Sequence, residues 1–226
     1  EEAEEQVATD DIQSVVDVLR HGALTQGPKI EEFENKVANY VGAKYAVAVA
    51  NGTAALHLAC MALELGEGDE VITSPNTFVA TSNSVLYVGA KPVFVDIDKQ
   101  TLNIDIIQIE KTILDSKNIK AIFPVHFAGL PCDMEKIKQL ADKYDLAVVE
   151  DAAHAIFSKY KNKFLGTIGD IGTFSFHETK NLSAGQAGAI SINNKKLISK
   201  TISVLDKGTN RRKAEKESLE FYDWIT

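Results

Sequence analysis

The fold of this chain is decided by the segment Ala46-Val47-Ala48-Val49-Ala50-Asn51-Gly52-Thr53-Ala54-Ala55-Leu56, in which a short apolar run passes through a small-residue turn straight into a helical stretch. Such a turn presents free backbone N–H groups and the positive end of the helix dipole to an anion. Thr53 adds a hydroxyl donor, so a phosphate is the natural ligand. The alternative is an ordinary strand-to-helix turn in which Thr53 caps the helix. The segment matches neither GxGxxG nor the P-loop pattern, which argues against a dehydrogenase on a dinucleotide-binding sheet.

Around this segment, short β-branched runs alternate with helical stretches. The runs cover residues 45–49, 71–73, 92–95, 121–125, 146–150, 173–176 and 189–192. Helical spacing of apolar residues is found at residues 54–65, 79–88, 106–114 and 134–144. This alternation predicts an α/β fold with a mostly parallel seven-stranded sheet and helices on both faces. Ligands of such sheets bind beyond the carboxyl ends of the strands.

Composition excludes several classes of protein. The 226 residues carry a net charge of −8, which argues against a nucleic-acid surface. The sequence lacks an apolar run of about 18 residues and starts with Glu1-Glu2-Ala3-Glu4-Glu5, so we expect neither a membrane span nor a signal peptide. Cys60 and Cys132 lie far apart, which suggests neither a zinc site nor a disulfide framework and fits a reducing cytoplasm.

Two further segments could carry chemistry. Val148-Val149-Glu150-Asp151-Ala152-Ala153-His154 places acids and an imidazole at the carboxyl end of an apolar run. A buried carboxylate there needs a cationic partner, and Asp151 facing a protonated pyridine nitrogen would have one. The alternatives are a helix cap or a metal ligand; with a single imidazole nearby in the sequence, we expect no metal.

The second segment is Phe174-Ser175-Phe176-His177-Glu178-Thr179-Lys180-Asn181, which follows another predicted strand. An isolated lysine is usually a solvated surface residue. A Schiff base with an aldehyde cofactor would make Lys180 useful, because the amine is released during the reaction and then acts as a neutral base. The order of the motifs favours this interpretation: a phosphate turn, an aromatic segment, the strand-end Asp151 and then Lys180.

Taken together, these segments resemble the DegT/DnrJ/EryC1/StrS sugar aminotransferases from about Gly27 to about Asn210. The motifs that carry the resemblance are Asn51-Gly52-Thr53-Ala54-Ala55-Leu56, Thr77-Phe78-Val79-Ala80-Thr81, Pro124-Val125-His126-Phe127-Ala128-Gly129, Glu150-Asp151-Ala152-Ala153-His154-Ala155 and Phe174-Ser175-Phe176-His177-Glu178-Thr179-Lys180-Asn181. The resemblance implies the large domain of a fold-type-I enzyme that depends on pyridoxal 5'-phosphate (PLP). It also implies a homodimer.

The resemblance assigns roles to residues of the predicted cofactor site. Lys180 would form the Schiff base with PLP, and Asp151 would pair with the pyridine nitrogen. His154 would approach the ring hydroxyl, and Phe78 would stack on the ring unless it is a core aromatic. The phosphate would be held by Thr53, the Ala54 amide and Ser175.

The implied reaction transfers an amino group from glutamate, giving 2-oxoglutarate, to a nucleotide-linked 4-keto-6-deoxy sugar. His177 favours amination at C4, and retention of Lys180 favours transamination over the dehydration of related enzymes that carry histidine there. The candidate substrate-binding residues are His177, Asn210, Arg211 and Arg212; the alternative for the arginine pair is a solvated stretch. The nucleotide stays open between dTDP, UDP and GDP.

Three segments are expected: an N-terminal helical segment at residues 1–26, the PLP-binding large domain at 27–206, and the truncated start of a C-terminal region at 207–226. The last eight residues are apolar and aromatic, unlike a solvated tail. Gly185-Gln186-Ala187-Gly188 departs from the usual Gly-Glu-Gly-Gly, and Asn51 replaces the usual Ser. These departures keep open an alternative, a non-catalytic relative that binds PLP or a nucleotide sugar and acts through association.

Overall fold

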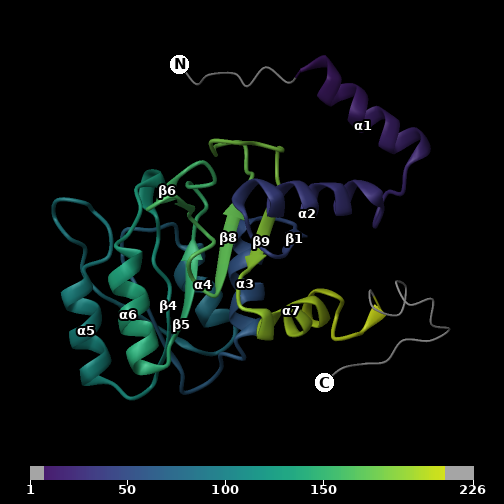
Figure 1. Cartoon of the computed structure of the whole chain (residues 1–226). Coiled ribbons are helices and arrows are strands. Elements are labelled where there is room, and N and C mark those ends of the chain that lie inside the picture. The colour runs from purple at the N-terminus through teal and green to yellow at the C-terminus, as the bar shows by residue number, and fades with distance from the viewer. Residues whose placement is uncertain (1–7, 212–226) are drawn as a thin grey trace.

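A seven-stranded sheet forms the centre of the computed structural model, which describes residues 8–211 (Figure 1). Its strands lie in the order β1-β9-β8-β5-β4-β2-β3. Their bounds are β1 Ala46–Val49, β2 Glu70–Thr73, β3 Lys91–Phe94, β4 Ile119–Ile122, β5 Ala147–Asp151, β8 Ile171–Ser175 and β9 Gly188–Ile192. Only β9 runs antiparallel to its neighbours, β1 and β8. The predicted mostly parallel seven-stranded sheet is confirmed.

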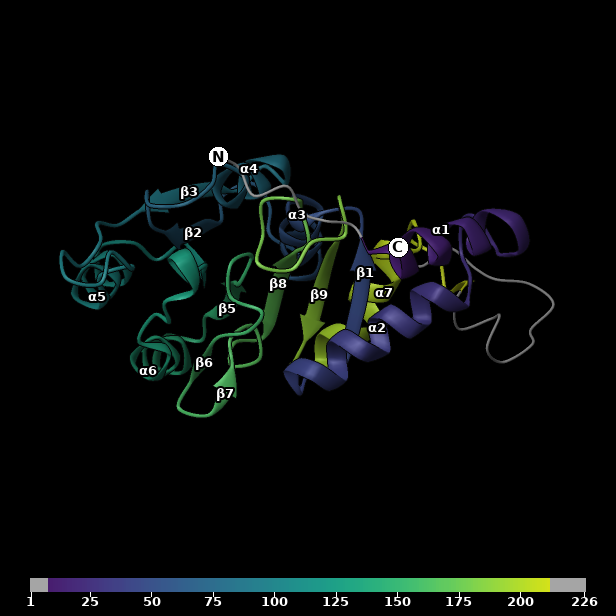
Figure 2. The same cartoon turned by 90° about the horizontal axis from the view of Figure 1, so that it is seen from above.

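Helices cover both faces of this sheet, as predicted. They are α1 Thr9–His21, α2 Pro28–Val41, α3 Gly52–Ala62, α4 Ala80–Tyr87, α5 Ile106–Asp115, α6 Met134–Tyr144 and α7 Ile198–Leu205. Figure 2 shows α3 and α4 on one face and α5 and α6 on the other. One apolar core lies between the sheet and α3, α4 and α7, and a second lies under α5 and α6. A third lies beneath α2, against β1 and β8.

The ends of several helices follow from local sequence. Pro28 occupies the first turn of α2, where its missing N–H costs nothing, and Gly42 ends the helix with a φ of 73°. Asp105 and Asp133 cap α5 and α6 by accepting hydrogen bonds from backbone N–H groups of the first turn. Helix α1 differs from the others because none of its residues is buried, and it projects beyond α2 (Figure 1).

Two elements were not anticipated. The strands β6 (Lys159–Tyr160) and β7 (Lys163–Phe164) form a small antiparallel hairpin, and α7 follows β9. The hairpin turns through Lys161 and Asn162, which both have positive φ angles of 45° and 68°, as a two-residue type I′ turn requires. Residues 219–226, which the sequence marks as apolar and aromatic, lie outside the described residues.

The turn between β1 and α3 lies directly against β9. A Cβ atom added to Gly188, the first residue of β9, would lie 2.4 Å from the backbone carbon of Asn51. Glycine is therefore required at this position so that the N-terminus of α3 can approach the sheet. Every helix between residues 8 and 211 is too short or too polar to span a lipid bilayer.

Candidate functional site

A cavity of about 410 Å3 lies beyond the carboxyl ends of β5 and β8, next to the N-terminus of α3. Most of the side chains predicted to form the site line it together: Thr53, Phe78, Asp151, His154, Ser175, His177 and Lys180. Thr77, His126 and Gln186 also line it, and none of these three was assigned a role from the sequence. The location agrees with the expectation that ligands bind at the carboxyl ends of parallel strands.

Lys180 lies on the connection between β8 and β9, and His154 follows β5. The Lys180 Nζ and His154 Nε2 atoms are 2.7 Å apart. An ammonium group can only donate hydrogen bonds, so we assign Lys180 as the donor, Nε2 as the acceptor and the imidazole hydrogen to Nδ1. Burial lowers the pKa of His154, and the positive charge of Lys180 lowers it further, against the opposing effect of Asp151. His154 is therefore neutral at neutral pH.

We predict that replacing Lys180 with methionine raises the His154 pKa only part of the way towards 6.5, the ordinary value for histidine. The charge of Lys180 disappears in this variant, but burial, the larger cause of the lowered pKa, remains. The measurement is an NMR titration of the imidazole in the cofactor-free protein, with His154→Gln identifying the resonance. A His154 pKa that does not move, or that falls, in the Lys180→Met variant would contradict the contact.

Asp151 ends β5 with its carboxylate almost fully buried, at 5% exposure. Its Oδ2 atom accepts a hydrogen bond from Thr81 Oγ1 at 2.7 Å, and its Oδ1 atom accepts one from the backbone N–H of Ala153 at 3.2 Å. The Thr81 hydroxyl in turn lies 2.7 Å from that of Thr77. Asp151 also lines the cavity, so its carboxylate is available to a ligand there.

The N-terminus of α3 is capped by Asn51, not by Thr53. The Asn51 side chain accepts a hydrogen bond from the Ala54 N–H at 2.8 Å. Ala54 does not line the cavity, whereas Gly52 and Thr53 do. The predicted phosphate contact of the Ala54 amide would therefore require Asn51 to release this hydrogen bond. The alternative that Thr53 serves as the helix cap is wrong.

Phe78 lies at the mouth of the cavity with 72% of its surface exposed. The alternative that it is a core aromatic is wrong. Its exposed ring leaves a flat apolar face free for a planar ligand. The rings of Phe127, which follows β4, and His154, which follows β5, meet edge to face with their centroids 6.3 Å apart.

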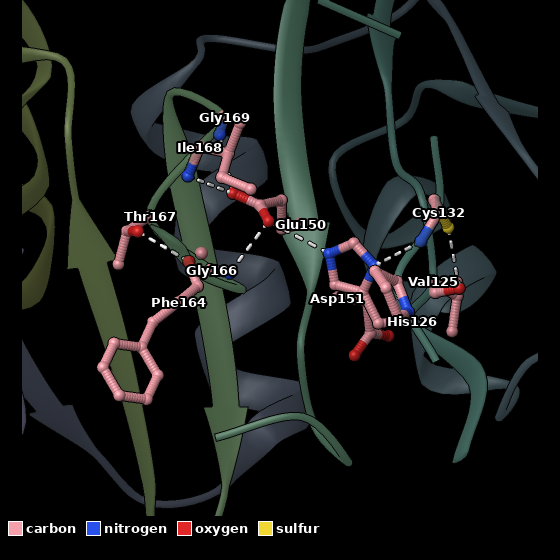
Figure 3. A network of polar contacts seen from close by, with 12 residues as sticks. Val125, His126, Cys132, Glu150, Asp151, Phe164, Gly166, Thr167, Ile168 and Gly169 are labelled. Carbon is pink, nitrogen blue, oxygen red and sulfur yellow. Dashed lines mark hydrogen bonds and ion pairs between the residues drawn. The ribbon is translucent and has the colours of Figure 1, made fainter. Parts of the chain in front are cut away.

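Glu150 precedes Asp151 but belongs to a different network, because successive side chains of a strand point to opposite faces. Its fully buried carboxylate accepts hydrogen bonds from the N–H groups of Gly166, Ile168 and Gly169, at 2.8, 2.6 and 2.6 Å. His126 Nε2 lies 3.0 Å from the same carboxylate. Figure 3 shows Glu150 directed towards the turn at residues 166–169 and Asp151 directed away from it.

His126 links this carboxylate to the loop after β4. The Cys132 N–H donates to His126 Nδ1 at 3.2 Å, which leaves Nε2 as the donor to Glu150. The buried Glu150 carboxylate is thus the shared acceptor of four N–H groups. Cys60 and Cys132 are both buried free thiols.

Of the predicted substrate-binding residues, His177 lines the cavity. Asn210 and Arg211 follow α7 and do not line the cavity. Arg212 lies outside the described residues. Their roles stay predictions.

Comparison with known proteins agrees with this geometry. The model of the DegT/DnrJ/EryC1/StrS aminotransferase family matches residues 5–221. The spore coat polysaccharide biosynthesis protein SpsC of Bacillus subtilis is 47% identical over 194 residues, which are 86% of this chain and 49% of SpsC. GDP-perosamine synthase of Escherichia coli O157:H7 is 46% identical over 178 residues, 79% of this chain and 48% of the enzyme.

A solved structure shows the same fold. The PLP form of the putative sugar aminotransferase Spr1654 from Streptococcus pneumoniae superposes with a TM-score of 0.87 at 32% identity, covering 97% of this chain and 59% of that one. The chain spans about half the length of the curated relatives it matches.

Proposed function

Because the chain belongs to the DegT/DnrJ/EryC1/StrS aminotransferase family, we propose that the protein containing it uses PLP to transfer an amino group from glutamate to a nucleotide-linked 4-keto-6-deoxy sugar. One observation supports this proposal above the others. The amine of Lys180 and the carboxylate of Asp151, which are 29 residues apart in the sequence (180 − 151), line one cavity beside the N-terminus of α3.

The cavity and its donors fit PLP. Its volume of about 410 Å3 lies within the range of roughly 300–1,000 Å3 for small-molecule sites. Gly52 and Thr53 at the positive end of α3, with Ser175 nearby, provide donors for a phosphate. Asp151 provides an anion for the ring nitrogen, and Phe78 provides an apolar face for the ring. All of these groups line the same cavity.

When bound, PLP would supply an aldehyde for an amine and a protonated ring that withdraws electrons. Lys180 is the lysine that lines the cavity, and its Nζ atom would bind this aldehyde and, as a free amine, would accept the proton from the α-carbon of the amino donor. Neutral His154 holds that Nζ atom through Nε2 at 2.7 Å, which keeps the amine inside the cavity. Asp151 keeps the ring nitrogen protonated because its buried carboxylate favours a cation beside it.

Two observations support the proposed sugar substrate: the sequence similarity to one relative and the position of His177. GDP-perosamine synthase, named for GDP-perosamine, is 46% identical to the matched part of the chain. His177 lines the cavity, and its Nδ1 atom lies 3.1 Å from Thr179 Oγ1 and accepts the Thr179 N–H at 3.3 Å. Nε2 is thereby left to donate to a substrate oxygen, in agreement with the proposed amination at C4. The homodimer implied by the resemblance stays a prediction.

The proposal predicts that the full-length protein, loaded with PLP, converts the cofactor to pyridoxamine phosphate when L-glutamate is added. One 2-oxoglutarate should appear for each cofactor converted, because the first half-reaction needs no sugar. The measurement is the visible spectrum together with chromatography of the released cofactor, with D-glutamate as the control. A PLP spectrum that L-glutamate leaves unchanged would instead indicate a non-catalytic binding protein.

A further inference from the structure

A chain of hydroxyl groups leads from the wall of the cavity to the back of the Asp151 carboxylate. Thr77 and Asp151 both line the cavity, whereas Thr81 lies between them at 0% exposure and does not line it. The two contacts of this chain, Thr77 to Thr81 and Thr81 to Asp151, are both 2.7 Å long. Thr81 therefore touches no ligand in the cavity and acts on the site only through its neighbours.

The direction of these hydrogen bonds follows from the chemistry of the groups. A carboxylate can only accept, so Thr81 gives its single hydroxyl hydrogen to Asp151 Oδ2. The short contact with Thr77 then requires Thr77 to donate to Thr81. Because Ala153 N–H binds the other carboxylate oxygen, both oxygens of Asp151 are held in fixed directions. The arrangement complements an ionised Asp151, since the donors are aimed at both of its oxygens.

Thr81 also connects Asp151 to the turn that carries Phe78. Its backbone N–H donates to the Phe78 carbonyl at 3.1 Å, and its own carbonyl accepts the hydroxyl of Ser84 at 2.9 Å. The threonine side chain thus points at β5 while its backbone is fixed in the first turn of α4. The end of β5 and the start of α4, which both contribute residues to the cavity lining, are joined through Thr81.

We propose that Thr81 is a positioning residue that fixes the Asp151 carboxylate as the partner of the cofactor's ring nitrogen. This inference rests on the proposed function, because it requires PLP in the cavity. A carboxylate that has lost the Thr81 hydrogen bond can rotate or recruit water. The ion pair with the ring nitrogen then weakens, although Asp151 itself is unchanged. Thr81→Val should therefore weaken the binding only of those ligands that carry a basic ring nitrogen.

The test compares two cofactors in the full-length protein. Thr81→Val, which keeps the shape of the side chain and removes the hydroxyl, should weaken PLP binding about tenfold, because a hydrogen bond to a charged group is lost. Binding of 1-deazapyridoxal phosphate, in which carbon replaces the ring nitrogen, should change less than about twofold. Thr81→Ser should restore the PLP affinity. The affinities are measured by equilibrium dialysis with absorbance detection.

The matched control is Thr201→Val, since Thr201 in α7 is equally buried and its hydroxyl donates to the carbonyl of Leu197, the residue before α7. This control should leave the affinity for both cofactors at the wild-type value. Equal weakening of PLP and its deaza analogue by Thr81→Val would show general damage to the cavity and overturn the positioning role. Unchanged PLP affinity would overturn it as well. Failure of the wild-type protein to bind PLP would instead overturn the proposed function, and this inference with it.

Discussion

Replacement of Lys180 with alanine should lower the rate of amino transfer from glutamate by about 10³-fold or more, because both the covalent link to the cofactor and the base that moves the proton are lost. Lys180 is half-buried and its side chain contacts that of His154, so the fold itself should persist. The rate is followed as 2-oxoglutarate formation in single turnovers of the PLP-loaded, full-length protein.

The control for this loss is Lys196→Ala, which removes an exposed lysine in the short helix at Lys195–Leu197. Lys196→Ala should keep the wild-type rate. A Lys180→Ala variant that retained activity within tenfold of the wild type would show that another base carries the proton. In that case the position of Lys180 in the cavity would be incidental.

Replacement of Glu150 with alanine should lower the free energy of unfolding by about 3–5 kcal/mol, the effect expected when one member of a buried charged network is removed. Four N–H donors lose their acceptor at once: those of Gly166, Ile168, Gly169 and His126. Each unsatisfied buried donor costs about 1–3 kcal/mol. Urea unfolding of the full-length protein, followed by circular dichroism, measures the difference.

Glu110→Ala is the matched control, because Glu110 forms an exposed ion pair with Lys143. Such pairs contribute about 0–1 kcal/mol. Were Glu150→Ala no more destabilising than Glu110→Ala, the buried network would not hold the turn at residues 166–169 and the loop after β4 together. A Glu150→Ala protein that does not accumulate in folded form agrees with the prediction, provided that Glu110→Ala does.

Much of the fold could be predicted because each strand of the sheet is an apolar, β-branched run between helical stretches. Strand order could not be predicted in this way, since β1 and β9 are neighbours across about 140 residues and pair through backbone groups. The β6–β7 hairpin has only two residues in each strand, too few for an alternating pattern. The turn residue Asn162 was its one local signal.

The candidate site was predictable where the expected chemistry requires a particular residue, as with Asp151 at the end of β5 and Lys180 in the connection after β8. The residues that hold Asp151 and Lys180 in place come from distant parts of the chain, so no pattern in the neighbouring sequence predicts them. Thr81 lies 70 residues before Asp151. No sequence pattern indicates whether its hydroxyl points to solvent or into the protein. Glu150 and Asp151 looked like one acidic pair, although strand alternation sends them to separate networks. That alternation was the signal that could have separated them.

Borohydride reduction of the PLP-loaded, full-length protein, followed by peptide mapping with mass spectrometry, tests the central claim most directly. The phosphopyridoxyl group should be found on the peptide that contains Lys180, at about one group per chain, and should be absent after Lys180→Ala replacement. Attachment to a different lysine, or a stoichiometric adduct that survives this replacement, would contradict the assignment of the cavity between β5, β8 and α3 as the cofactor site.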